Sequence, residues 1–80
     1  MDSAFAVHML NDSGKQKAMR LADMFDGLFA SVRNVALEGV HPEEKADPEV
    51  SRELALVRTH LEMACFYAKK AMANNPLNQQ

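Results

Sequence analysis

One stretch constrains the fold more than any other, the segment 47–73 with the sequence DPEVSRELALVRTHLEMACFYAKKAMA. Its apolar residues recur at alternating steps of four and three, the spacing of one side of an amphipathic helix. These seam residues are Val50, Leu54, Val57, Leu61, Ala64, Ala68 and Ala71. Asp47 is a suitable N-cap, Pro48 loses no needed donor at the first helical position, and Asn-Asn-Pro at 74–76 ends the pattern. The segment therefore predicts one long helix over about 48–73.

A second amphipathic segment precedes it and predicts a helix over about 14–37. Ser13 followed by Gln16 has the spacing of a capping box, which places the start of the helix there. Gly39 is a suitable C-cap. The expected seam is Ala18, Leu21, Phe25, Leu28, Val32 and Val35, with Ala22, Phe29 and Ala36 beside it.

Two helices of similar length, joined by the short polar stretch VHPEEKA, predict an antiparallel hairpin. The fold class is therefore all-α, with residues 1–80 as a single domain. Residues 1–10 are expected to form a short helix or arm, and the polar residues 74–80 are expected to fray. The single cysteine, Cys65, excludes an internal disulfide and is interpreted as a small packing residue.

A hairpin of this size buries only one stripe of each helix, so much apolar surface remains uncovered. On the far side of the second helix Arg52, Thr59 and Phe66 occupy the outermost positions of a mostly apolar face. The apolar residues left outside the seam include Phe5, Met24, Phe29, Leu56, Met63 and Phe66. Such a surface predicts a compact homo-oligomer. Two interpretations of the far face stay open: burial between copies alone, or burial that also holds a ligand.

Composition limits the function. Nine basic and eleven acidic residues give a net charge of −2, which argues against a surface that tracks long DNA or RNA. A small anion held by a few convergent cations remains possible. We expect no signal peptide and no membrane span. The chain has no Gly-rich phosphate loop, nucleophile elbow or Cys/His metal spacing, so we expect no enzymatic activity, metal or cofactor.

Residues 52–72, RELALVRTHLEMACFYAKKAM, resemble the signature helix of the phage anti-CBASS type-two proteins. These proteins share a helical hairpin domain with some Thoeris anti-defence proteins. The matching positions are Arg52, Ala55, Thr59, Leu61, Glu62, Phe66, Lys70 and Ala71. The stretch KAMRLADMFDGLFASV is similar to the first hairpin helix of the family, so the resemblance covers about residues 12–73.

The resemblance implies a sponge for cyclic oligonucleotides. Members bind cyclic dinucleotides, and some also bind cyclic trinucleotides, without cleaving them. They sequester these messengers in the cytoplasm of the infected bacterial host, so that the immune effector stays inactive. They assemble as compact oligomers, often hexamers, with pockets between protomers. The alternative is a structural hairpin oligomer that binds a protein partner.

The resemblance also implies two sets of binding residues. Arg52 and Thr59, seven residues apart on one face, are assigned to a trinucleotide pocket, because Arg binds phosphate in bidentate fashion and Thr adds a hydroxyl. The alternative for Arg52 and Thr59 is an interface ion pair with Glu62 or Glu53.

A dinucleotide pocket in this family uses an aromatic residue of the N-terminal segment and a basic residue of the first hairpin helix. Here Phe5 and His8 are the candidates for base stacking, which needs only a flat π face. Lys17 and Arg20 are the candidate cations.

Overall fold

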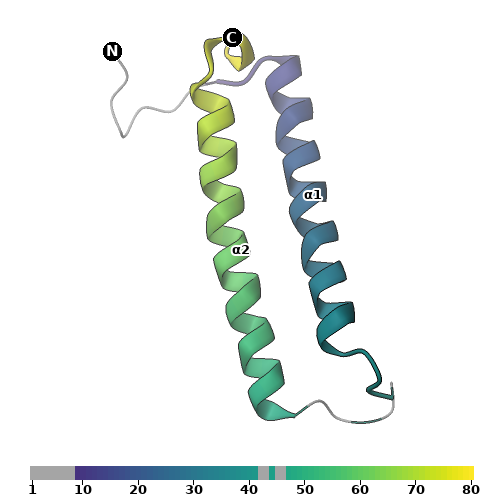
Figure 1. Cartoon of the computed structure of the whole chain (residues 1–80). Coiled ribbons are helices and arrows are strands. Elements are labelled where there is room, and N and C mark those ends of the chain that lie inside the picture. Colours follow the sequence, from purple (N-terminus) through teal and green to yellow (C-terminus); the bar gives the residue numbers. More distant parts are fainter. Residues whose placement is uncertain (1–8, 42–43, 45–46) are drawn as a thin grey trace.

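Two antiparallel helices form most of the computed structural model, which describes residues 9–41, 44 and 47–80. Helix α1 spans Asp12–Ala36, helix α2 spans Pro48–Asn74, and a 3-10 turn, η1, spans Pro76–Asn78. The helices run side by side, and the C-terminus lies next to the start of α1 (Figure 1). The molecule is elongated, with extents of 52 × 22 × 13 Å. The predicted all-α hairpin is confirmed, and each helix boundary lies within two residues of its predicted position.

Each helix begins at a side chain that caps it. The Asn11 Oδ1 atom accepts a hydrogen bond from the backbone N of Gly14 at 2.8 Å, and the Asp47 Oδ1 atom accepts one from the backbone N of Glu49 at 2.8 Å. These bonds satisfy donors that have no partner within the first turn of the helix. The Asp47 cap agrees with the prediction. The predicted start at Ser13 is wrong, because the Asn11 cap begins the helix earlier and leaves Ser13 inside the first turn.

The chain leaves α1 through a turn centred on glycine. The C-cap of α1 is Leu37, two residues before the predicted Gly39. Gly39 has φ = +85°, a left-handed conformation that side-chain-bearing residues rarely adopt, and the backbone N of Val40 donates to the Leu37 oxygen at 3.0 Å. The predicted C-cap role of Gly39 is therefore wrong, because Gly39 forms the turn that follows the Leu37 cap.

The helices meet along a stripe of half-buried apolar side chains. These are Ala18, Leu21, Ala22, Phe25, Phe29 and Val32 of α1, and Val50, Leu54, Val57, Leu61, Cys65, Ala68 and Met72 of α2. The predicted seam coincides with this stripe at most of its positions, including Val32 and Ala68, and departs from it at four. Leu28 and Val35 are exposed, as are Ala64 and Ala71, whereas Phe29 is half-buried. The cause is helix geometry, because a stripe drawn at 3.5 residues per turn rotates by about 20° per heptad on a straight helix.

The C-terminal residues are held against both helices, so the prediction of a frayed end is wrong. Leu10 and Gln79 form an isolated antiparallel bridge, and the backbone N of Gln80 donates to the Met9 oxygen at 2.9 Å. Asn78 is 1% exposed. Met9 and Leu10 are not helical, and residues 1–8, which contain the rest of the predicted N-terminal helix or arm, lie outside the described residues.

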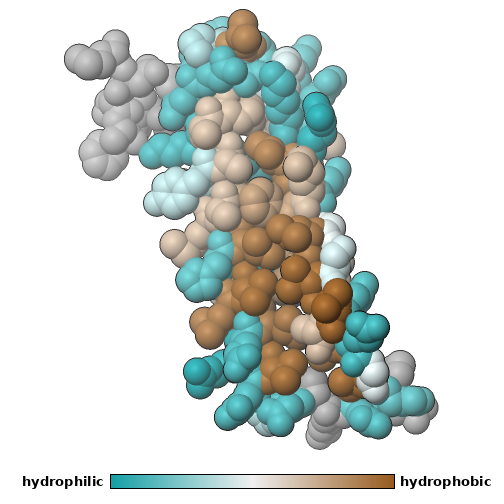
Figure 2. Space-filling view, in the orientation of Figure 1, coloured by the Kyte–Doolittle hydropathy of each residue, from teal (hydrophilic) through white to brown (hydrophobic). Residues whose placement is uncertain are grey.

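No apolar side chain is fully buried in the part of the chain that the structure describes. Figure 2 shows apolar residues gathered into one patch that extends over both helices, with hydrophilic residues along its borders. The exposed large apolar side chains of the two helices are Met19, Met24, Leu28, Val35, Leu56, Met63, Phe66 and Tyr67. An uncovered apolar surface of this kind is typical of a binding surface. Over the described ranges, neither helix has an apolar stretch long enough to cross a bilayer.

Candidate ligand-binding surfaces

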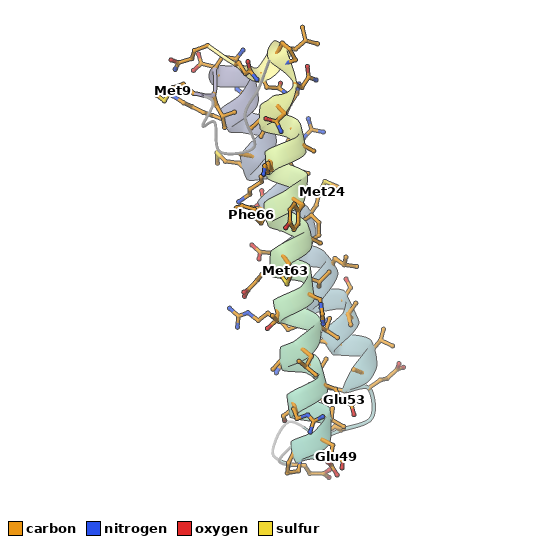
Figure 3. The ribbon with its side chains drawn as sticks, turned by 90° about the vertical axis from the view of Figure 1, so that its left-hand side faces the viewer. Met9, Met24, Glu49, Glu53, Met63 and Phe66 are labelled. Atoms are coloured by element: carbon orange, nitrogen blue, oxygen red, sulfur yellow. The ribbon has the colours of Figure 1, made fainter. Side chains whose placement is uncertain are left out.

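The outer face of α2 carries Arg52 and Thr59 on a mostly apolar background. Both residues are exposed, and seven positions of helix separate them by about 10 Å along the axis. Phe66 and Met63 lie on the side of α2 that faces the viewer in Figure 3, and their side chains are 62% and 53% exposed. The face therefore combines a cation, a hydroxyl and large apolar groups, as the sequence predicted.

Arg52 and Thr59 differ in whether their side chains already form hydrogen bonds within the chain. Arg52 forms no hydrogen bond or ion pair with any residue that the structure describes. Glu62, one of the two partners considered for it at an interface between copies, pairs within the chain with Arg58, whose Nε lies 3.2 Å from the Glu62 Oε1. The Thr59 hydroxyl donates to the Ala55 oxygen at 3.1 Å. In this conformation Arg52 is open to an anion, whereas Thr59 offers only acceptor lone pairs and must rotate before it donates to a ligand.

Lys17 and Arg20 share a groove between the helices, beside the end of the hairpin that holds the C-terminus. The groove has a volume of about 310 Å³, and its other lining residues are Leu21, Met24, Ala68 and Met72. It therefore has two cations, four apolar side chains and no carboxylate. This composition suits an anion with a flat apolar body, because the cations bind the charge while the apolar groups cover the rest.

The structure does not bring the two predicted cation sets together within one chain. Arg52 lies 16 residues before Ala68, which lines the groove of Lys17 and Arg20, so about 24 Å of helix separates them. The candidate stacking residues Phe5 and His8 lie outside the described residues.

A second groove runs between the helices and is lined by mixed charges. It has a volume of about 220 Å³, and its charged lining residues are Asp26, Arg58, Glu62 and Lys69. Two cations and two carboxylates cancel, and the Arg58–Glu62 ion pair already uses one of each. This groove therefore does not favour an anionic ligand. Cys65, a free half-buried thiol, lines it as one of its packing residues.

Asn78 forms hydrogen bonds with both helices that the sequence did not predict. Its side-chain Oδ1 accepts a hydrogen bond from the Lys17 ammonium at 2.7 Å, across 61 positions of sequence. Its side-chain Nδ2 donates to the Met72 oxygen at 2.9 Å. Contacts between residues so far apart leave no periodic signal, and the only local hint was the Asn-Pro turn at 75–76.

These features define a class of protein: a small all-α hairpin whose helices leave cation-bearing, partly apolar faces uncovered. The family model described as "Acb2/Tad1, hairpin domain" matches residues 9–73, which is most of the chain, so the protein belongs to this family. The resemblance to the anti-CBASS type-two proteins is thereby confirmed. The match ends before η1 begins. Neither the curated proteins nor the solved structures gave a match.

Proposed function

We propose that this protein is a phage anti-defence sponge, which binds cyclic di- and trinucleotide immune messengers and sequesters them without cleavage. The observation that carries the proposal is the membership of residues 9–73 in the Acb2/Tad1 hairpin family. In the cytoplasm of the infected bacterial host, a captured messenger no longer reaches the CBASS effector. The geometry of the two helix faces supports this function in three ways.

The first support is the guanidinium of Arg52, which stands on an apolar face and has no partner among the described residues. A cyclic trinucleotide has three phosphates related by approximate three-fold symmetry. A symmetric assembly repeats each Arg52, so one residue per chain supplies a guanidinium to every phosphate. Thr59, once rotated, adds a hydroxyl donor from the same face.

The second support is the incomplete core. The described residues include no buried apolar side chain, yet large apolar groups cover the outside of both helices. Association of copies removes this surface from water, which favours assembly by about 25 cal/mol per Å² of buried apolar area. We propose a homo-oligomer with pockets between protomers, and the resemblance favours a hexamer.

The third support is the carboxylate-free groove of Lys17 and Arg20. Two cations match the two phosphates of a cyclic dinucleotide, and the apolar lining covers part of the ring. In this proposal Phe5 and His8 of the N-terminal segment stack on the bases.

The test is a thermal-shift panel of cyclic di-AMP, cyclic di-GMP, cyclic GMP-AMP and cyclic tri-AMP. A ligand that binds only the folded protein raises the melting temperature. Arg52→Ala should weaken cyclic trinucleotide binding by at least about 30-fold, since it removes the guanidinium at all three phosphates and even one hydrogen bond to a charged group contributes about 2 kcal/mol. Arg58→Ala is the matched control, because Arg58 lies on the same helix but is paired with Glu62.

Recovery of the ligand after heat denaturation separates sequestration from hydrolysis. Intact cyclic nucleotide in chromatography and mass spectrometry supports a sponge, whereas a linear product contradicts it. No shift with any member of the panel would instead favour the alternative, a hairpin oligomer that binds a protein partner.

A further inference from the structure

The C-terminal segment, residues 75–80, packs through Asn78 against the end of the hairpin where α1 begins and α2 ends. The backbone oxygen of Asn78 accepts from the backbone N of Asn11 at 3.0 Å, and its Nδ2 donates to the Met72 oxygen at 2.9 Å. A Cβ atom on Gly14 would lie 2.5 Å from the same Asn78 oxygen, so the segment packs directly against α1. Asn78 is thus fixed by contacts to the first turn of α1 and the last turn of α2.

These contacts leave one side-chain atom of Asn78 for Lys17. A carbonyl oxygen such as that of Met72 can only accept, so the amide group must direct its Nδ2 at Met72 and its Oδ1 away from it. That Oδ1 lies 2.7 Å from the Lys17 Nζ. A long, flexible lysine side chain is therefore anchored at its charged end by a buried residue that is itself held in place.

The anchor holds Lys17 without cancelling its charge. The Asn78 Oδ1 is a neutral acceptor, and two of the three ammonium donors remain for other partners. Arg58 shows the contrast, because its guanidinium is paired with the carboxylate of Glu62. Lys17 makes no such ion pair with the residues that the structure describes, and it lines the groove that it shares with Arg20.

We propose that Asn78 is a positioning residue for the dinucleotide site: it holds the Lys17 ammonium at the groove in the orientation that binds a phosphate. The inference rests on the proposed sponge function and adds a component from outside the hairpin family match, which ends at residue 73. Asn78 itself does not touch the ligand. It acts by removing the rotational freedom that Lys17 would otherwise lose on binding.

The test is a double-mutant cycle between Asn78→Ala and Lys17→Met, with cyclic dinucleotide affinity measured by calorimetry. Asn78→Ala should weaken binding about fivefold, the cost of immobilising one flexible side chain. In the Lys17→Met background the same substitution should change affinity by less than about twofold, because there is no ammonium left to position. An equal loss in both backgrounds would mean a structural role only and would overturn the inference.

Two further variants separate the positioning role from the packing of the segment. Gln79→Ala removes a comparable hydrogen bond from the same segment, between the Gln79 Nε2 and the Ala73 oxygen at 2.9 Å, and should leave dinucleotide affinity unchanged. Asn78→Asp keeps an acceptor for Lys17 but loses the donor to the Met72 oxygen, as Asn78→Ala does, and its carboxylate pairs with the lysine ammonium and cancels the charge. It should weaken dinucleotide binding more than Asn78→Ala does, and unchanged binding would overturn the inference.

Cyclic tri-AMP separates this inference from the proposed function. Its affinity should be unaffected by every Asn78 and Lys17 variant, since the Arg52 face lies about 24 Å away along α2. If the unaltered protein binds cyclic tri-AMP but no cyclic dinucleotide, the positioning role is wrong and the sponge function stands. If it binds no cyclic nucleotide at all, both are overturned.

Discussion

Alanine at Gly14 should destabilise the protein, although alanine is the better helix former. Gly14 is a buried residue in the first turn of α1. A Cβ atom there would lie 2.5 Å from the Asn78 backbone oxygen, 3.0 Å from the Leu10 Cδ2 and 3.1 Å from the Leu10 Cβ. The closest of these atoms belongs to the backbone, so it cannot yield by a simple side-chain rotation. The C-terminal segment must shift away from α1.

The size of the effect follows from the contacts that the shift breaks. Asn78 makes three hydrogen bonds beyond its own turn, to Asn11, Lys17 and Met72. At about 1 kcal/mol each they contribute about 3 kcal/mol to the free energy of unfolding. Replacement of glycine by alanine within a helix returns at most about 1 kcal/mol. The net loss is therefore about 2 kcal/mol, or about 10 °C in melting temperature for a chain of this length.

Gly27→Ala is the matched control, because Gly27 lies in the middle of the same helix and a Cβ atom added there would meet nothing within 4 Å. It should raise the free energy of unfolding by about 1 kcal/mol. Both variants are compared with the unaltered protein in urea unfolding followed by circular dichroism, at one protein concentration because the proposed assembly would contribute to stability. A Gly14→Ala variant as stable as Gly27→Ala would refute the proposed packing of the segment.

Two further perturbations test the cap and the apolar face. Asn11→Ala should lower the free energy of unfolding by about 2 kcal/mol and Asp47→Ala by about 1 kcal/mol, both measured by urea unfolding. Asn11 contributes more because its Nδ2 also donates to the Leu77 oxygen at 2.9 Å, whereas Asp47 only caps its helix. Equal losses would contradict a role for Asn11 in holding the C-terminal segment. If the proposed oligomer forms through the apolar face of α2, Phe66→Glu should reduce the sedimentation coefficient in analytical ultracentrifugation, because it places a charge on that face. Leu77→Glu is the control, since Leu77 is also exposed but lies on η1, and the same reduction in both would argue against a specific interface.

The helices were predictable because periodicity and end chemistry agree. Asp47 and Pro48 mark the start of α2 in the sequence as clearly as they do in the structure. The register of the seam was less predictable. The observed α2 stripe passes from Leu61 to Cys65 and Met72, whereas the expected one passed through Ala64 and Ala71. Neighbouring small residues on the same helix side carry too weak a hydropathy contrast to separate a period of 3.5 from one of 3.6.

The C-terminal segment was not predictable because its contacts are polar and distant in sequence. Asn11 bonds to residues 66 and 68 positions later through its side-chain Nδ2. A run such as PLNQQ has no apolar pattern, so composition alone favoured fraying. The sequence also identified Lys17 and Arg52 as candidate cations without revealing that one is anchored by Asn78 and the other has no partner among the described residues.

The separation of the two cationic surfaces bears on how, in the proposed sponge, so short a chain would bind two kinds of cyclic nucleotide. Lys17 and Arg52 lie near opposite ends of the hairpin, and about 24 Å of helix separates Arg52 from the Lys17 groove. The Arg52 face offers one guanidinium per chain for the three phosphates of a cyclic trinucleotide, so in the proposed sponge it would need copies of itself around a three-fold axis, whereas the Lys17 groove already offers two cations for the two phosphates of a cyclic dinucleotide. Because the groove lining includes neither Arg52 nor Thr59, the two proposed ligands would bind without competing for the same side chains.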